Sequence, residues 1–444
     1  MKSIYKLSIA LLLLPLMAIQ GQNIDKQVVG DSLTLSNIIN SVINNYPSLK
    51  KAEKDIQSEN AKIDLTKTAY LPDVNFATSY TRLGPTTSIT MPIGGVNRIL
   101  QLYPEDVYSA AISVNENIYD FGKTTKSVAL NEQNKEIAKL SVTQIKQRLS
   151  LALMFNFYSI AFIQEAIIIK DEELKTLNEH LNFVEKKAST GSATKYDILT
   201  TKVRISAIEN QKTDLQTALQ IQKGQLNSYL GKSQGTQLVI KNELLISKLI
   251  PSVDSLCNIA FANRNEMKIA QQKVAISQSR LNVVKVQNNP SLNFFASGGV
   301  KNGYFNDFLQ DVPKLNFAVG VGLKVPIFDA NRSKYIKIQA NADIEGNQQE
   351  TELTRRNITN EVVESKANAQ SALKKVTQSE LQLEQAKQAY SLAETNFEAG
   401  VITNLDLLDS FTSLAESKLV LLKTKIDYTV SLYKLKIALG EQIY

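Results

Sequence analysis

The chain has 444 residues, with 50 Lys and Arg against 43 Asp and Glu, and a formal net charge of +7. Charges of both signs alternate along it, which is typical of solvated helix faces and argues against nucleic-acid binding. A single His and a single Cys exclude an intrachain disulfide and argue against a His/Cys metal site or a Cys–His dyad. We therefore expect that the protein is not an enzyme and that it binds no metal and no cofactor.

The sequence opens on an apolar run with basic residues before it. Lys2 and Lys6 precede residues 7–19, a run too short and wrongly flanked for a membrane-spanning helix. This pattern predicts a signal peptide over residues 1–21, with cleavage after Gly21 or a residue or two beyond. No Cys follows the signal region, which argues against N-terminal lipidation. The protein is expected to leave the cytoplasm.

The rest of the chain predicts one unit present twice, each copy with a helix, two strands, a very long helix, a Gly-containing tip turn and a returning helix. In copy one, residues 22–230, we expect these elements at about 33–70, 72–83, 107–119, 125–187, 188–194 and 194–230. In copy two, residues 253–444, we expect them at about 253–288, 290–302, 312–328, 332–397, 397–403 and 403–440. Residues 231–252 form an irregular linker between the copies.

Matching motifs in the same order support the duplication. The matches are "GSATKYDIL" (191–199) with "GVITNLDLL" (400–408), "IYDFG" (118–122) with "IFDAN" (327–331), and "PDVNF" (72–76) with "PSLNF" (290–294). The first two pairs are 209 residues apart and the third is 218 apart. The difference falls on a longer loop in copy one, "GPTTSITMPIGG".

The long helices carry a heptad pattern, with Val376, Leu383, Tyr390 and Phe397 recurring every seven residues. Such spacing indicates helices that coil against neighbours. A helix of roughly sixty residues spans about 90 Å, which exceeds an ordinary globular core and predicts a rod or a tube. Residues 149–169 are long and apolar enough to span a membrane, but polar side chains interrupt them, so we expect them inside the helical bundle.

The four strands alternate apolar residues with small or polar ones, and residues 70–121 and 289–330 hold 14 of the 31 aromatics. These features favour strands in a membrane with an aromatic girdle. Because about eight strands are needed to close a barrel, four strands require several copies of the chain. Three copies would give twelve strands around a polar interior. The residues expected to line that interior include Ala111, Ser113, Gly299, Gly320 and Gly322.

The chain resembles the TolC-like outer-membrane efflux proteins, the outer-membrane factors of tripartite pumps and type I secretion systems. The likeness covers essentially the whole mature chain, and its most specific motif is the turn Gly-x-x-Ser/Thr-x-x-Asp-x-Leu. That turn occurs twice, as Gly191, Thr194, Asp197 and Leu199, and as Gly400, Thr403, Asp406 and Leu408. The resemblance implies a mainly α protein with a transmembrane β part: a homotrimer with a twelve-stranded barrel in the outer membrane of a Gram-negative bacterium. A coiled-coil α-barrel would extend into the periplasm, with a belt formed by residues 22–32 and 231–252.

The aspartates of these turns have two explanations. Thr194 with Asp197, and Thr403 with Asp406, have the spacing of capping boxes, which alone could explain both carboxylates. A cap does not explain Asp409, which shares a helix face with Asp406. The resemblance places acidic rings at the periplasmic entrance, and implies that Asp406 and Asp409 line a constriction there.

The resemblance also implies a gate and a docking site. The family's gate uses a tyrosine and an arginine, but Phe397 and Ile402 stand at the aligned positions. The closed state must therefore be held differently, for example by packing of Phe397. The two tip turns are where a periplasmic membrane-fusion adaptor is expected to dock; the residues concerned are Gly191, Thr194, Asp197, Gly400 and Thr403. His180 is expected on the helix surface.

Two functions of different class remain open on the sequence. The first is a passive trimeric exit duct in outer-membrane lipid, working with an inner-membrane transporter of RND, ABC or MFS type. The second is a periplasmic coiled-coil scaffold or adhesin without channel activity. The sequence leaves the exported substrate undetermined, whether drug, metal or protein.

Overall fold

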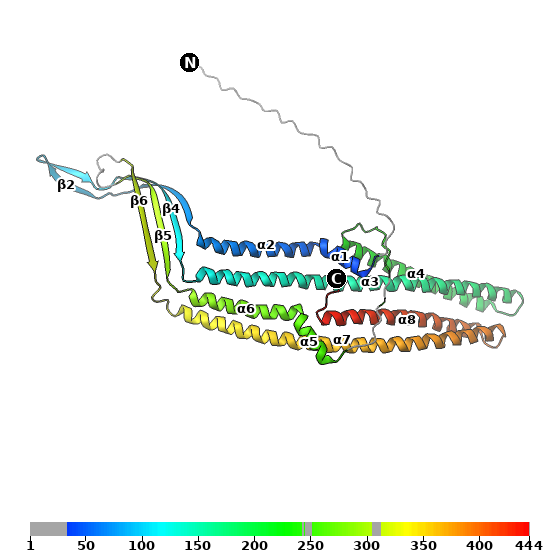
Figure 1. Ribbon diagram of the computed structural model, residues 1–444. Helices are drawn as coiled ribbons and strands as arrows, with labels where there is room; N and C mark the ends of the chain where they lie inside the picture. The colour runs from blue at the N-terminus through cyan, green and yellow to red at the C-terminus, as the bar shows by residue number, and fades with distance from the viewer. Residues whose placement is uncertain (1–32, 242–243, 245–250, 304–311, 444) are drawn as a thin grey trace, which may run out of the picture.

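A computed structural model describes residues 33–241, 244, 251–303 and 312–443 of the chain (Figure 1). The predicted signal peptide and residues 22–32 of the expected belt lie outside the described residues. Figure 1 shows long helices running side by side, with a sheet of strands at one end of the bundle.

Within the described residues, the two halves of the chain contain the same elements in the same order, except for a 3-10 turn and an additional hairpin in the first half. The first half contains α1 (Leu35–Asn45), α2 (Pro47–Lys67), a 3-10 turn (Thr68–Tyr70), β1 (Asp73–Arg82), β2 (Ser88–Ile93), β3 (Val96–Gln101), β4 (Asp106–Tyr119), α3 (Lys123–Ser189) and α4 (Lys195–Leu230). The second half contains α5 (Val253–Asn263), α6 (Asn265–Val286), β5 (Ser291–Lys301), β6 (Lys314–Lys324), α7 (Arg332–Glu398) and α8 (Asn404–Ala438). The strand expected to reach residue 328 ends at Lys324.

Each helix that was expected to precede the strands is broken in two, so the predictions of single helices over 33–70 and 253–288 were wrong. In copy one the break falls at Tyr46, whose φ of −69° and ψ of 130° are extended. Its cause is Pro47, because a proline disfavours helical geometry in the residue before it. In copy two the break falls at Arg264, with φ −60° and ψ 128°. There the buried guanidinium donates to Glu266, Glu361 and the Ala438 carbonyl.

The additional hairpin corrects a second expectation, that "GPTTSITMPIGG" (84–95) is a loop. β2 pairs with β3, and the two-residue turn between them is Gly94–Gly95, both with positive φ. Two glycines with positive φ suit the tight turns that join antiparallel strands. The signal was present in the sequence, because Ile89, Met91 and Ile93 alternate with polar or small residues directly before the Gly pair.

The helical core lies at the waist of the molecule, where α1 and the end of α4 pack on the middle of α3. Ile38, Leu153, Met154, Phe157 and Leu226 are buried there. α3 contains the one segment, among the described helices, that is long and apolar enough to cross a membrane, and half of that segment is buried within the chain. The prediction that residues 149–169 pack inside the bundle is confirmed.

The linker between the copies contacts the start of the first one. Leu33 pairs with Ile240 as an isolated parallel bridge, and its backbone N–H donates to the Val239 carbonyl at 2.9 Å. Leu238 is buried in the same core as α1. The described part of the linker therefore lies against the waist of the bundle.

Beyond the waist, two helical hairpins run to the tips. α3 and α4 form the first hairpin, and α7 and α8 form the second. α3 and α7 have 67 residues each, or about 100 Å of helix. The hairpins meet where α3 packs against α8, so the helices lie in the order α4, α3, α8, α7. One side of α4 and one side of α7 remain at the ends of this row.

Candidate functional site

The sheet places side chains of opposite character on its two faces. Its strands are antiparallel in the order β1, β4, β5, β6. The register pairs Ala111 with Gly299 and Ser113 with Ser297, so the small and polar residues of neighbouring strands share one face. Phe295, opposite Gly320, is a large apolar residue on this same face. All five residues predicted to line a polar interior lie on this face: Ala111, Ser113, Gly299, Gly320 and Gly322.

The opposite face is apolar and exposed. Phe317 and Leu315 of β6 are 86% and 88% exposed, and Phe76 of β1 is 70% exposed. Residues at alternate positions of the other strands, among them Ile112 and Tyr108, continue the same surface. Ordinary soluble proteins bury such a face, and a lipid bilayer is the solvent that suits it.

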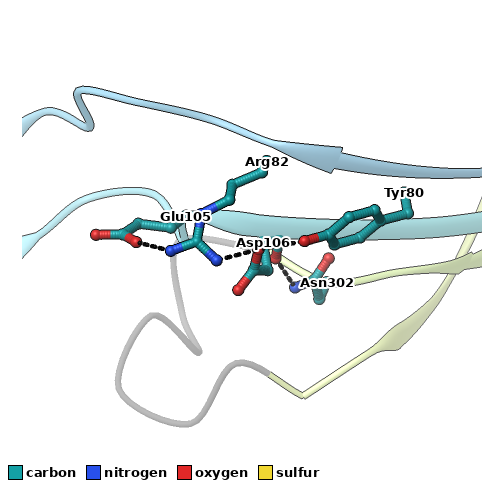
Figure 2. Close-up of polar contacts among 5 residues, drawn as sticks. All are labelled: Tyr80, Arg82, Glu105, Asp106 and Asn302. Atoms are coloured by element: carbon teal, nitrogen blue, oxygen red, sulfur yellow. Dashed lines mark hydrogen bonds and ion pairs between the residues drawn. The ribbon is translucent and has the colours of Figure 1, made fainter.

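The apolar face ends in a polar network where β1 ends and β4 begins (Figure 2). This end of the sheet is the one far from the helices (Figure 1). Arg82 of β1 pairs with Asp106, its cross-strand neighbour, at 3.5 Å and with Glu105 at 3.0 Å. The Tyr80 hydroxyl donates to Asp106 Oδ1 at 2.9 Å, and the Asn302 amide donates to the Asp106 carbonyl at 2.7 Å. A tyrosine ring on the apolar side with its hydroxyl in a charged network is typical of a membrane–water interface.

At the other end of the molecule, the two predicted tip turns have nearly the same geometry. Gly191 and Gly400 have φ of 76° and 77°, the left-handed conformation that glycine tolerates. Thr194 and Asp197 form a capping box at the start of α4. Thr403 and Asp406 form the equivalent box at the start of α8.

The capping boxes explain the immediate surroundings of two predicted carboxylates. Asp406 Oδ2 accepts from the Thr403 hydroxyl at 2.6 Å and from its backbone N–H at 2.9 Å. These two bonds lower the pKa of Asp406, because they stabilise the charged carboxylate. Asp406 and Asp409 are both exposed and lie on the side of α8 opposite the buried Leu408. Leu405, which shares their side, is exposed as well.

Asn404 connects the two hairpins close to their tips. This side chain is only 4% exposed and lies beside the first turn of α4. Its amide donates to the Asp197 carbonyl at 3.2 Å and to the Thr201 hydroxyl at 3.3 Å. Its Oδ1 accepts from His180 Nε2 of α3 at 2.7 Å. Asn404 thus joins α8 to both helices of the first hairpin.

Two weaker contacts accompany this connection. Arg204 of α4 pairs with Asp409 of α8 at 3.4 Å, so one of the predicted constriction carboxylates has a cationic neighbour within its own chain. Lys187 of α3 donates to the Phe397 carbonyl at 3.2 Å, and its ammonium lies 4.7 Å from the Phe397 ring centroid. Phe397 itself is buried with Val184 and Leu407 between the hairpins.

The sequence predicted the tip turns and the carboxylates but missed Asn404, Arg204 and Lys187. Ile402 packs half-buried beside Phe397. A polar residue at the first position of a helix gives no sign that it is buried, because such positions are usually exposed. One signal in the sequence could have drawn attention to Asn404. The equivalent residue of copy one is Lys195, so the two copies differ at this position.

The expectation that His180 lies on the surface was wrong. It is half-buried, hydrogen-bonded to Asn404, and its ring centroid lies 5.4 Å from that of Phe397. Burial lowers the pKa of His180, and the Lys187 charge acts in the same direction, against the smaller raising effects of Asn404 and Glu394. His180 is therefore neutral at neutral pH.

We expect the pKa of His180 to lie below the ordinary value of 6.5. Because the unfolded chain binds a proton at the ordinary pKa, stability should decrease as the pH falls below 6.5, until the folded pKa is reached. The chain has one His, so an NMR titration of protein purified without a histidine tag follows a single imidazole. The chain in denaturant is the control, and a folded pKa at or above the denatured one would contradict the prediction.

No group of three or more His, Cys, Asp or Glu in the described part of the chain is placed to hold a metal ion.

Comparison with known proteins gives one consistent result. The family model described as outer membrane efflux protein matches residues 38–232 and 256–441. The outer membrane protein TolC of Vibrio cholerae serotype O1 is 21% identical over 418 residues, covering 91% of this chain and 90% of TolC. The toluene efflux pump outer membrane protein TtgC of Pseudomonas putida is 24% identical and covers 75% and 69% of the two chains.

Solved structures share the fold. A crystal structure of CusC matches with a TM-score of 0.77 at 18% identity and covers 92% of each chain. The outer membrane protein VceC of Vibrio cholerae matches with a TM-score of 0.73 at 17% identity, covering 92% of this chain and 97% of VceC. This chain belongs to the outer membrane efflux protein family: it is a transport conduit of the Gram-negative outer membrane that extends into the periplasm, and not an enzyme.

Proposed function

We propose that three copies of this chain form a passive exit duct, with a twelve-stranded barrel in the outer membrane above a helical tunnel. One observation carries the proposal: a four-stranded sheet with an exposed apolar face and a polar face of small residues. Within the described chain, β1 and β6 each have one neighbour only, so both edges of the sheet are free. Pairing of β1 in one copy with β6 in the next would close the barrel.

The helices support the same assembly. Tyr196, Leu199 and Val203 form an exposed stripe on α4, at one end of the helix row. Leu381 and Leu392, eleven residues or about three turns apart, are exposed on α7 at the other end. Contact between α4 of one copy and α7 of the next would bury both stripes and close the tunnel from six hairpins. Outer membrane efflux proteins work as trimers with periplasmic adaptors and inner-membrane pumps, which agrees with this count.

We assign the periplasmic constriction to Asp406 and Asp409. Both carboxylates point to water in the single chain, and three copies would present six of them. A wet lumen relieves the cost of bringing such charges together. The closed state is held by Asn404 and the buried Phe397, which attach the second hairpin to the first. Opening then requires α8 to move away from α3 and α4.

We place adaptor docking at the two tip turns, with Gly191, Thr194 and Asp197 on one and Gly400 and Thr403 on the other. A methyl group built on either glycine meets nothing within 4 Å, so the turns are open to a partner. The adaptor is a periplasmic membrane-fusion protein, and the pump is an inner-membrane transporter of RND, ABC or MFS type. A scaffold or adhesin without channel activity is not favoured by the family relationship.

Two measurements test the duct. Protein from the outer-membrane fraction should migrate as heat-modifiable trimers, and in planar bilayers it should conduct ions. A soluble monomer that does not conduct would overturn the proposal.

The constriction is tested by Asp406→Asn combined with Asp409→Asn. Asparagine keeps a side-chain oxygen for the cap but removes the charge, so helix α8 should start normally. Block of single-channel current by divalent or trivalent cations should weaken, because the charged rings that attract them are gone. Asp427→Asn, an exposed carboxylate on the same helix, is the matched control and should leave the block unchanged. Equal block in wild type and double variant would show that these two carboxylates do not form the constriction.

A further inference from the structure

A cavity of about 230 Å³ lies between the two hairpins, close to their tips. Its walls are aromatic: His180 and Phe183 come from α3, Tyr390 and Phe397 from α7, and Phe411 from α8. The rings form two groups. The Phe397 ring contacts those of His180 and Phe183 at centroid distances of 5.4 and 6.1 Å, and the Tyr390 ring contacts that of Phe411 at 5.6 Å.

The charged side chains that line the cavity are all acidic. They are Glu179 of α3, and Glu394 and Glu398 of α7. Glu394 accepts a hydrogen bond from the Tyr390 hydroxyl at 3.3 Å, which keeps its carboxylate beside an aromatic ring. The described residues contain no ion-pair partner for any of the three. His180 in the wall adds no positive charge at neutral pH.

The aromatic rings beside the cavity already bind a cation. The Lys187 ammonium lies 4.9 Å from the Phe183 ring centroid and 4.7 Å from the Phe397 ring centroid. A cation over an aromatic face is attracted by the negative charge density of the ring. Lys187 does not line the cavity, and its single positive charge is outnumbered by the three carboxylates that do.

We propose that this cavity is a binding site for a small organic cation, such as a quaternary ammonium compound. Aromatic walls with acidic side chains at the mouth match a charge that carries its own apolar groups. A hydrated metal ion would find too few converging oxygen ligands, and an anion would face three carboxylates. The volume lies below that of drug-sized sites, which limits the ligand to a fragment-sized cation.

The position of the cavity gives the ligand a structural effect. A bound cation would contact α3 of the first hairpin together with α7 and α8 of the second, beside the link formed by Asn404. It would therefore hold the two hairpins together at the tip. The binding itself does not depend on the proposed duct, so the two can fail independently.

Phenyltrimethylammonium is a suitable probe, and tert-butylbenzene is its uncharged isostere. Binding to the purified full-length protein in nanodiscs can be measured by saturation-transfer NMR. We expect the cation to bind more tightly than the isostere. Combining Glu179→Gln with Glu394→Gln should weaken cation binding by about fivefold or more, because it removes two negative charges that attract the cation. Phe183→Leu should weaken it as well.

Glu364→Gln is the matched control, since Glu364 is an exposed carboxylate on α7 far from the cavity. It should bind the probe like wild type. Equal binding of the cation by wild type and the double Gln variant, or equal binding of the cation and its isostere, would overturn the proposal. Amide hydrogen exchange provides the second readout: the cation should protect residues 176–183 and 407–411, and unchanged exchange there would equally contradict the site.

Discussion

Replacing Asn404 by leucine is expected to open the periplasmic end, raising single-channel conductance in planar bilayers several-fold. Asn404 is buried and bonded to His180, Thr201 and the Asp197 carbonyl, and leucine is similar in size but can make none of these bonds. Thr201 keeps its hydrogen bond to the Asp197 carbonyl, so the loss falls on His180 Nε2, and a buried polar group left without its partner costs about 1–3 kcal/mol. In a trimer the closed state loses this connection three times over.

Arg204→Ser is the informative comparison, because it removes an exposed polar link between the same two helices, α4 and α8, near the tip. The Arg204 and Asp409 side chains are 33% and 66% exposed, and Arg204 Nη2 lies 3.4 Å from Asp409 Oδ1. Solvent-exposed ion pairs contribute roughly 0–1 kcal/mol and weaken further with salt. Arg204→Ser should therefore change conductance little. Unchanged conductance in Asn404→Leu, together with a large increase in Arg204→Ser, would show that Arg204 and not Asn404 holds the hairpins together.

The two ends of the molecule differ in how far the sequence predicts them. The faces of the sheet follow from alternation along each strand, because neighbouring side chains in a strand point to opposite sides. The placement of Gly299 and Gly320 on the polar face therefore needed no tertiary information. The capping boxes were equally local, since Thr403 and Asp406 lie three residues apart.

The connection between the hairpins could not be found in the same way. His180 and Asn404 are 224 residues apart, and their contact depends on how α3 and α8 pack. The heptad pattern shows that the helices coil against neighbours, but it does not say which helices meet. The helix breaks at Tyr46 and Arg264 illustrate the same limit, since only the first has a local cause, in Pro47. The cavity between the hairpins depends on the same packing.

Gly299→Val is expected to abolish assembly of the barrel, so that heat-modifiable trimers no longer appear in the outer-membrane fraction. A Cβ atom at Gly299 would lie 2.2 Å from the Ala110 carbonyl oxygen and 2.7 Å from Ala111 Cα. These are backbone atoms, which cannot move aside without disturbing the pairing of β4 with β5. Overpacking of this kind costs about 1–3 kcal/mol at a single site, and a trimer contains three such sites.

Gly298→Val separates this clash from any general effect of adding a side chain to β5. Gly298 is the adjacent residue on the exposed apolar face, and a Cβ atom there meets nothing within 4 Å. Valine has a higher strand propensity than glycine and suits a lipid-facing position, so Gly298→Val should assemble at least as well as wild type. Strand propensity alone predicts that both variants are stabilised, whereas the clash predicts that they differ. Normal trimers from both variants would mean that β4 and β5 lie farther apart at Gly299 in the assembled barrel than in the single chain.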